Sequence, residues 1–377
     1  MRFAPKALAV TSALALSLTV TACAPVGSGD GGGEKSDATA AYEDAQNMSD
    51  GERMDKIVEA AEKEGKVSVF LRSDVVFEDI EKAFEDKYDI DLTIHNPGLP
   101  TAVYQQIAES SEAGRQQADV VETFSYELEL VYPEENLVAE MPKFITEAST
   151  DPSLAGKYSV GSFQYPFIPM WNTKEITGGD VPKSLTDFAD PVWKGKIVMA
   201  KGDFLWSWYK TWFEYLTEEK GMSVDDFEKL MLGIAENASV TDSSNPAAQG
   251  IASGQYKGGP NLALTAGQKL GGNAPVAWEP AMEPVVTVPL STSLIKDAPH
   301  PNAAMVFADW YASEGSDIIE KEQFVQQNPQ EKDLEGADIK STDLTKMDMD
   351  DIDEWRHAFE NLTSGKKDIL PESVRDS

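Results

Sequence analysis

The segment Val67-Ser68-Val69-Phe70-Leu71 is apolar at four of its five positions and predicts a buried β-strand. The chain around it alternates between helices and strands: a helix over 54–64, a helix over 77–88, a strand over 90–94, a helix over 102–113 and a strand over 118–122. Strands that alternate with amphipathic helices are typical of a parallel sheet with helices packed on it. The sequence therefore predicts an α/β fold.

Polar residues follow the first three predicted strands, where each strand ends. In open parallel sheets, ligands bind beyond the carboxyl ends of the strands. Five ligand-binding residues are therefore expected at this edge: Arg72, Ser73, Asn96, Thr123 and Ser125. The Arg72 guanidinium suits a carboxylate or a phosphate, and a solvated surface arginine is the alternative interpretation.

A second lobe is expected to begin near Pro166. Strands are predicted over 167–171, 197–200 and 261–264, with helices over 204–216 and 227–236. A turn is expected at 243–246, followed by a short helix that Gly254 ends. A strand over 285–289 would return the chain to the first lobe, before a helix over 303–311. The predicted division is 51–165 plus about 285–325 for lobe 1, 166–284 for lobe 2, and 326–377 for a C-terminal segment that docks on a lobe.

The first 22 residues have the features of a lipoprotein signal peptide. Arg2 and Lys6 precede an uncharged apolar stretch, and Val20-Thr21-Ala22-Cys23 fits a site where the cysteine is acylated and the chain is cut before it. That stretch is about 14 residues long, whereas a membrane span needs roughly 20. We therefore expect lipid on Cys23 to hold the protein at the outer face of a membrane, with residues 23–50 as a flexible tether. An ordinary signal peptide with an incidental cysteine is the alternative.

The charge, cysteine and histidine content of the chain disfavours several kinds of partner and metal site. The chain has 65 acidic and 32 basic residues, a net charge of −33, which disfavours nucleic acid and anionic lipid surfaces. With one cysteine there is no intramolecular disulfide and no thiolate metal cluster. The three histidines, His95, His300 and His357, show no metal-ligand spacing. No cofactor and no metal site are expected.

Four stretches together resemble a known family. They are Ala118-Asp119-Val120-Val121, the stretch 181–197 (VPKSLTDFADPVWKGKI), Ser253-Gly254-Gln255-Tyr256, and the stretch 298–310 (APHPNAAMVFADW). They are similar to sequences in the extracellular solute-binding proteins of ABC importers, and most similar to the group that binds ferric iron, phosphonates, phosphorylated sugars and thiamine-like molecules. The resemblance covers about residues 67–322. It implies a two-lobed periplasmic-binding-protein fold of class II, with a hinge and a ligand cleft between the lobes.

The resemblance also bears on the ligand. Ferric members hold iron with two adjacent tyrosines, and the matching stretch here, 262–267, contains none, although it offers Thr265. The helix that begins near Lys201 supplies two further candidates, Asp203 and Trp206, and the segment before the strand at 285 supplies Trp278 and Glu279. A tryptophan beside a carboxylate suits a cation, while packing inside the protein is the alternative for each tryptophan. An organic cation, a phosphonate or phosphorylated organic molecule, and iron or an iron chelate all stay open.

The function expected from these features is a lipid-anchored, extracytoplasmic receptor that delivers a small solute to an ABC permease and its ATPase. We expect a monomer that is not an enzyme. The alternatives are a sensing or adhesion lipoprotein and an extracellular hydrolase. The sequence has no Gly-x-Ser-x-Gly and no His-Glu-x-x-His motif, which disfavours the hydrolase.

Overall fold

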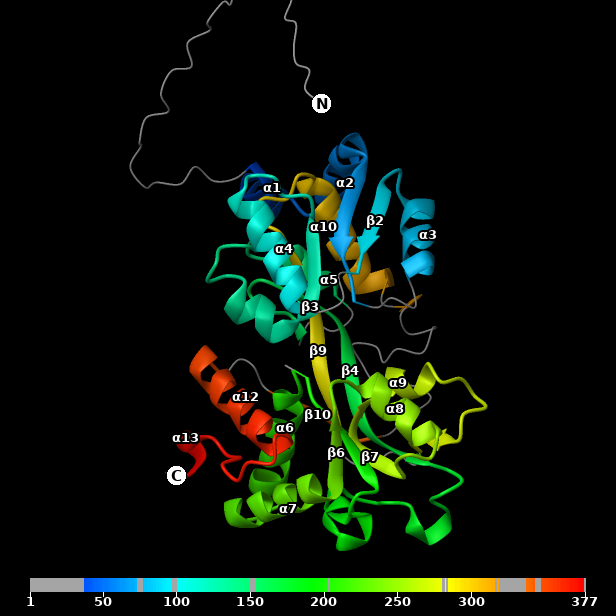
Figure 1. Cartoon of the computed structure of the whole chain (residues 1–377). Coiled ribbons are helices and arrows are strands. Elements are labelled where there is room, and N and C mark those ends of the chain that lie inside the picture. Colours follow the sequence, from blue (N-terminus) through cyan, green and yellow to red (C-terminus); the bar gives the residue numbers. More distant parts are fainter. Residues whose placement is uncertain are drawn as a thin grey trace, which may run out of the picture. The chain divides into compact units, whose positions relative to one another are not determined.

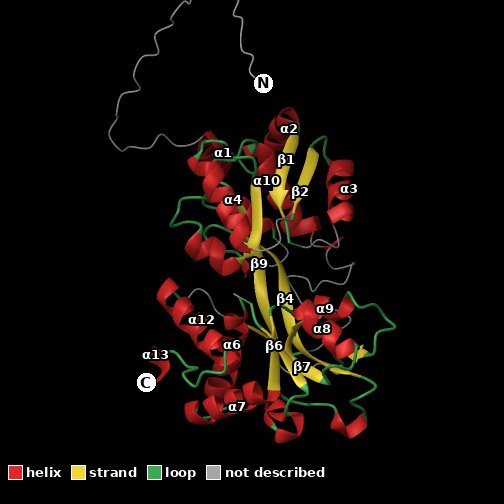
Figure 2. Ribbon diagram, viewed as in Figure 1, coloured by secondary structure: helices red, strands yellow, loops and turns green. Residues whose placement is uncertain are grey.

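The computed structural model describes residues 37–72, 77–96, 100–149, 154–202, 204–279, 282, 284–315, 317–318, 337–342 and 347–375. The chain divides into two units, Met1–Glu34 and Lys35–Ser377, and all of the described residues belong to the second. In them, helices flank the strands of a mixed α/β structure (Figure 2).

Lobe 1 is built on three parallel strands, in which β1 pairs with both β2 and β3. The strands are β1 (Lys66–Phe70), β2 (Asp91–His95) and β3 (Val120–Phe124), and the helices are α1 (Asp37–Asn47), α2 (Arg53–Glu64), α3 (Phe77–Lys87), α4 (Pro100–Glu112), α5 (Lys143–Ala148) and α10 (Pro301–Trp310). Helix α2 ends at Gly65, whose left-handed backbone (φ 72°) favours glycine and lets its N–H bond to Ala61. The predicted strand–helix alternation of this lobe is confirmed.

Lobe 2 repeats this plan with β5 parallel to both β6 and β7. The strands are β5 (Ile197–Ala200), β6 (Ala238–Thr241), β7 (Gly258–Ala263) and β8 (Val276–Ala277), and the helices are α6 (Leu205–Glu214), α7 (Val224–Asn237), α8 (Ser244–Ala252) and α9 (Leu264–Gln268). Ser223 caps α7 by accepting a hydrogen bond from the N–H of Asp226 at 3.1 Å. The buried face of α6 is aromatic, with Trp206, Trp208 and Tyr209 fully enclosed.

Two long strands, β4 (Val160–Asn172) and β9 (Val285–Leu294), run from one lobe into the other (Figure 1). The end of β9 pairs with β3 through the matches Val120↔Leu294 to Phe124↔Leu290, and β4 pairs with β9 and then with β7. The described strands therefore form one sheet in the order β2-β1-β3-β9-β4-β7-β5-β6, with β10 on β9 and β8 on β4. A continuous hydrogen-bonded ladder joins the lobes at these two strands.

The described part of the C-terminal segment lies on lobe 2. Strand β10 (Ile339–Ser341) pairs with the start of β9, and α12 (Met349–Thr363) packs against α6, before the short α13 (Glu372–Arg375). The Tyr209 hydroxyl donates to the Ile369 carbonyl at 2.8 Å, and Trp355 packs against both Tyr209 and Phe213. Aromatic contacts and one buried hydrogen bond therefore fix this segment to α6.

Three sequence-based boundaries are wrong. Residues 37–47, expected in the tether, form α1, because Tyr42 is buried and its hydroxyl donates to the Ile295 carbonyl at 3.1 Å. The strand predicted from 167 begins at Val160, because the residues before Pro166 pair with β9. The turn expected at 243–246 is the first turn of α8, which tolerates Pro246 near its N-terminus.

In the described part of the chain, no helix is both long and apolar enough to cross a membrane. The predicted signal peptide, Cys23 and the first part of the tether lie outside the described residues.

Candidate ligand-binding site

Two of the predicted residues follow the first strands of lobe 1. Arg72 comes two residues after β1, and its backbone N–H donates to Glu122 Oε2 on β3 at 3.0 Å. Its guanidinium carbon lies 5.0 Å from the centre of the Phe124 ring, within the range of a cation–π contact. Asn96 follows β2 and is exposed.

The two predicted residues at the end of β3 make hydrogen bonds inside the protein. Thr123 is fully buried and its hydroxyl donates to Glu127. Ser125 donates to the Pro289 carbonyl at 3.1 Å and shares a 2.6 Å hydrogen bond with the Ser291 hydroxyl, both on β9. Thr123 therefore orients a carboxylate, and Ser125 ties the end of β3 to the crossing strand.

Aromatic rings from both lobes meet at the end of β3. The ring centres of Phe124 and Phe204 are 4.4 Å apart. Those of Tyr126 and Trp206 are 5.3 Å apart, and these two rings meet edge to face. Phe204 also touches Phe167 of β4 at 5.5 Å, and Phe167 lies 5.5 Å from Tyr165. We call these six residues the aromatic cluster: Phe124, Tyr126, Tyr165, Phe167, Phe204 and Trp206. It places Trp206, predicted from sequence, next to residues of lobe 1.

The remaining predicted residues of lobe 2 lie around α9. Thr265 is buried, and its hydroxyl shares a 2.7 Å hydrogen bond with the Tyr165 hydroxyl, which joins α9 to the aromatic cluster. Trp278 is half-buried and packs on α9, where a Cβ on Gly267 would lie 2.8 Å from its ring. Glu279 is exposed. Two other candidates, Ser73 and Asp203, lie outside the described residues.

Two carboxyl groups stand beside Arg72. Glu122 is fully buried, and burial raises its pKa above the ordinary value, although the N–H of Arg72 and the Tyr311 hydroxyl (2.9 Å) oppose the rise. Burial also raises the pKa of the Glu127 carboxyl, while the hydrogen bond from Thr123 and the positive charge of Arg72 lower it in part. The edge of lobe 1 thus combines a guanidinium with carboxyl groups in a partly desolvated setting.

The sequence reasoning missed Glu127, Tyr126 and Tyr165. Tyr126 and Glu127 come two and three residues after the end of β3, so extending the strand-end rule two residues beyond Ser125 would have found them. Tyr165 had no such signal, because its position depends on how far β4 extends.

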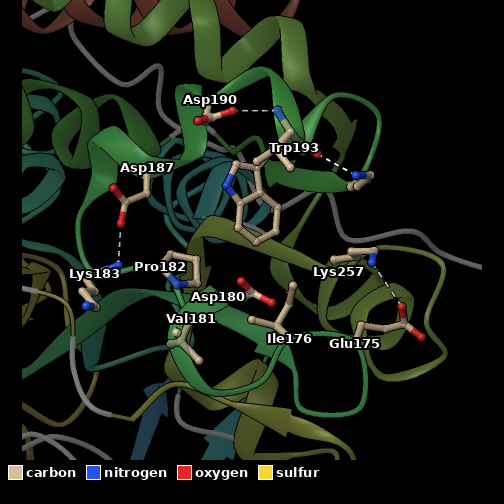
Figure 3. A pocket seen from close by; sticks show the side chains of 13 residues that line it. Glu175, Ile176, Asp180, Val181, Pro182, Lys183, Asp187, Asp190, Trp193 and Lys257 are labelled. Carbon is tan, nitrogen blue, oxygen red and sulfur yellow. Dashed lines mark hydrogen bonds and ion pairs between the residues drawn. The ribbon is translucent and has the colours of Figure 1, made fainter.

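The stretch 181–197, one of the four that carry the family resemblance, forms turns and short 3-10 helices of lobe 2. The Asp187 carboxylate accepts from the N–H groups of Lys183 (2.7 Å) and Ser184 (3.2 Å), and Asp190 accepts from the N–H of Val192 (2.8 Å). These turns and the Lys257–Glu175 ion pair (3.3 Å) border a cavity of about 500 Å³ in lobe 2 (Figure 3). Its carboxylates and lysines lie on turns and at a strand start, away from the strand ends where the candidate site is.

A family model described as bacterial extracellular solute-binding protein matches residues 116–348. The chain belongs to this family. It is a solute-binding protein of ABC-type transport, a class that binds small ligands outside the cytoplasm and delivers them to ABC permeases. The resemblance inferred from sequence is confirmed, and the family consists of binding proteins rather than enzymes.

Solved structures agree on the fold. Iron-bound HitA from Pseudomonas aeruginosa is 20% identical, with a TM-score of 0.59 over 80% of this chain and 99% of that one. The substrate-binding protein of an ABC transporter from Agrobacterium tumefaciens is 14% identical, with a TM-score of 0.62 over 79% and 94%. AfuA from Actinobacillus pleuropneumoniae, with fructose-6-phosphate bound, is 19% identical, with a TM-score of 0.55 over 80% and 97%. The two-lobed fold is thereby confirmed. None of the curated protein sequences matches this chain.

Proposed function

We propose that this protein is a lipid-anchored receptor that binds one small organic solute between the strand ends of its two lobes and passes it to an ABC permease and its ATPase. The observation that supports this most directly is the aromatic cluster, flanked by Arg72 and Glu127. Ring faces and a few fixed charges are what small-molecule sites use for contact area and orientation.

The residues at this edge favour an organic solute over a bare ferric ion. Fe(III) prefers several oxygen ligands such as phenolates and carboxylates. The aromatic cluster has two phenols, and both make hydrogen bonds inside the protein: the Tyr165 hydroxyl bonds to Thr265, and the Tyr126 hydroxyl donates to Glu127 at 3.4 Å. HitA holds iron and AfuA holds fructose-6-phosphate, so structures with this fold include receptors for both kinds of ligand. The aromatic residues here suit the second kind, a molecule with an apolar or ring portion and charged groups.

Native mass spectrometry of the full chain, purified from its own host without denaturation, tests this proposal. We expect the mass of the protein plus one small organic molecule, and thermal stabilisation when that molecule is added back. A protein stabilised only by ferric salt would contradict the organic ligand class. A bare protein mass, with no stabilisation by ferric citrate, sugar phosphates, phosphonates, polyamines or amino acids, would contradict the receptor function.

The lipid anchor has a separate test. Replacing Cys23 by serine removes the only thiol that can be acylated, so Cys23→Ser is expected to move the protein from the membrane fraction to the medium. Undiminished membrane retention of Cys23→Ser would contradict the anchor and leave the ligand proposal intact.

A further inference from the structure

Glu127 of lobe 1 lies next to a contact with lobe 2. It begins a short π-helix (Glu127–Val131) three residues after the end of β3. The Thr123 hydroxyl donates to its carboxylate, and the Tyr126 hydroxyl donates to it at 3.4 Å. The ring of Tyr126 in turn meets that of Trp206 on α6, with ring centres 5.3 Å apart. Two hydrogen bonds therefore hold this carboxyl group beside the place where the lobes touch.

Arg356 of α12 lies on the lobe 2 side of the same contact. Arg356 and Trp206 line one cavity of about 340 Å³. Figure 1 shows α12 alongside α6, and ring contacts of Trp355 and Phe359 with Tyr209 fix it there. The positive charge of Arg356 is therefore carried by lobe 2.

The charges of Glu127 and Arg356 act on each other across the boundary between the lobes. Burial raises the pKa of the Glu127 carboxyl, while the hydrogen bonds from Thr123 and Tyr126 and the positive charges of Arg72 and Arg356 lower it in part. Arg72 acts from lobe 1 and Arg356 from lobe 2. Glu127 is partly buried, and opposite charges attract each other more strongly where water is partly excluded.

Arg356 has donors for more than one carboxylate. Its guanidinium pairs through one nitrogen with Asp353, one turn earlier on α12. A guanidinium has five N–H donors in a planar fork, so one ion pair does not use them all. The remaining donors can bind a second carboxylate when the lobes approach each other.

We propose that Arg356 and Glu127 form an ion pair across the two lobes that favours their closed arrangement. The pair joins α12 to the helix that follows β3, beside the ring contact of Tyr126 with Trp206. This inference rests on the proposed receptor function, in which the lobes take a solute between them. It assigns the C-terminal segment, which docks on lobe 2, a role in holding lobe 1.

Pulsed electron paramagnetic resonance of the chain in its solute-free form, verified by native mass, tests this ion pair. Spin labels on Glu78→Cys of α3 and Lys229→Cys of α7, both exposed, report the distance between the lobes once Cys23→Ser removes the native thiol. Arg356→Gln should lower the ratio of short to long distances at least threefold at low salt, because the closed arrangement loses an attraction. An unchanged distance distribution in Arg356→Gln would overturn the inference.

Three further variants separate the pair across the lobes from other effects of losing Arg356. Asp353→Asn removes the pair inside α12 and should keep or raise the fraction of short distances. Lys366→Gln removes an exposed cation from the same segment and should leave that fraction unchanged. In the Glu127→Gln background, Arg356→Gln should have no further effect, because its partner is already gone.

The outcome of these variants is decisive in either direction. A loss of short distances in Asp353→Asn or Lys366→Gln as large as that in Arg356→Gln would overturn the inference. Independent, additive losses in Glu127→Gln and Arg356→Gln would also overturn it, because paired groups are coupled.

Salt provides a second measurement of the same pair. The Debye length is about 3 Å at 1 M NaCl, so the labelled parent protein should lose short distances there, and Arg356→Gln should change less. An equal response to salt in both would contradict an attraction between charges.

These results are separate from those that test the receptor function, because none of them requires a solute. If the ion pair is overturned, the protein can still be a receptor whose lobes close without it. If native mass spectrometry and thermal stabilisation show no ligand, the receptor function is overturned, and the coupling between Arg356 and Glu127 is still measured.

Discussion

The two lobes present different chemistry at the edges that face the candidate site. Lobe 1 contributes charge beside the rings of Phe124 and Tyr126: Glu122 and Glu127 each lie within hydrogen-bond or Coulomb reach of Arg72. Lobe 2 contributes mainly rings and a hydroxyl, those of Phe204, Trp206 and Thr265, together with the ion pair of Lys201 and Asp242, which follow β5 and β6. Yet both are built on parallel strands of one continuous sheet. The two lobes therefore share a backbone plan, and they differ in the residues that follow each strand.

The largest effect on stability is expected when a buried phenylalanine ring is removed from the core of either lobe. Phe84 of α3 packs against Phe307 and Trp310 in lobe 1, and Phe227 of α7 packs against Tyr209 and Phe213 in lobe 2. Each Phe→Ala change should cost about 3–5 kcal/mol of unfolding free energy, because it leaves a cavity in a closed core. Calorimetry of Phe84→Ala and Phe227→Ala measures this loss.

The number of unfolding transitions shows whether the two lobes unfold together. Because β4 and β9 join the lobes in one ladder, we expect a single transition that moves down by a similar amount in both variants. Two separated transitions, with only one of them shifted in each variant, would show that the lobes unfold independently and would contradict this coupling.

Affinity tests the charged edge of lobe 1. Arg72→Ala should lower the affinity for an anionic ligand about ten- to a hundredfold, since a hydrogen bond to a charged group contributes about 1.5–3 kcal/mol. The affinity for a purely cationic ligand should change little in the same variant. The measurement is a titration of wild type and Arg72→Ala with the same anionic ligand, and equal affinity would show that Arg72 takes no part in recognition.

The pH dependence of stability tests the burial of one carboxyl group in lobe 1, that of Asp309. Burial of the Asp309 carboxyl on α10, reinforced by Glu314 and opposed by Lys87, raises its pKa to about 6. A raised carboxyl pKa favours the folded state only while the group is protonated, so this group costs stability as pH rises from about 4 to 6. Asp309→Asn should therefore be more stable than wild type by about 1 kcal/mol at pH 7, discounted for partial exposure.

Chemical denaturation at two pH values checks this sign. The advantage of Asp309→Asn should shrink toward zero below pH 4, where the wild-type carboxyl is protonated in both the folded and the unfolded state. An advantage that is equal at pH 4 and pH 7 would contradict the assignment to ionisation.

The smallest effect is expected where the C-terminal segment meets lobe 2 through surface charge. Lys340 pairs with Glu219 at 3.0 Å at the protein surface, so Lys340→Gln should change the unfolding free energy by less than about 1 kcal/mol. Thr211→Val, which removes the buried hydrogen bond to the Thr342 hydroxyl (2.9 Å), is the matched comparison and should cost more. A larger loss in Lys340→Gln would mean that charge, rather than packing on α6, holds the segment.

The fold was largely predictable because the apolar periodicity of strands such as 197–200 is local. Helix α1 was not, because its polar, alanine-rich sequence resembles a tether, and only Tyr42 and two alanines bury against the body. Local pattern says little about a segment whose helix is stabilised by docking.

For the candidate site, the sequence predicts positions after the strands but not the contacts of the side chains there. The strand-end rule led to Arg72, Thr123 and Ser125, yet Ser125 bonds to the crossing strand. The contacts of Phe124 with Phe204 and of Tyr126 with Trp206 each join residues 80 positions apart in sequence. Such juxtapositions depend on how segments pack together, which no local spacing reports.

If solute binds between the lobes, as we propose, the distance between the lobes should respond to it. Spin labels on Glu78→Cys of α3 and Lys229→Cys of α7, both exposed, report this distance once Cys23→Ser removes the one native thiol. The distance distribution, measured by pulsed electron paramagnetic resonance, should shift or narrow when the solute found by mass spectrometry saturates the protein. An identical distribution with that solute demonstrably bound would contradict binding between the lobes.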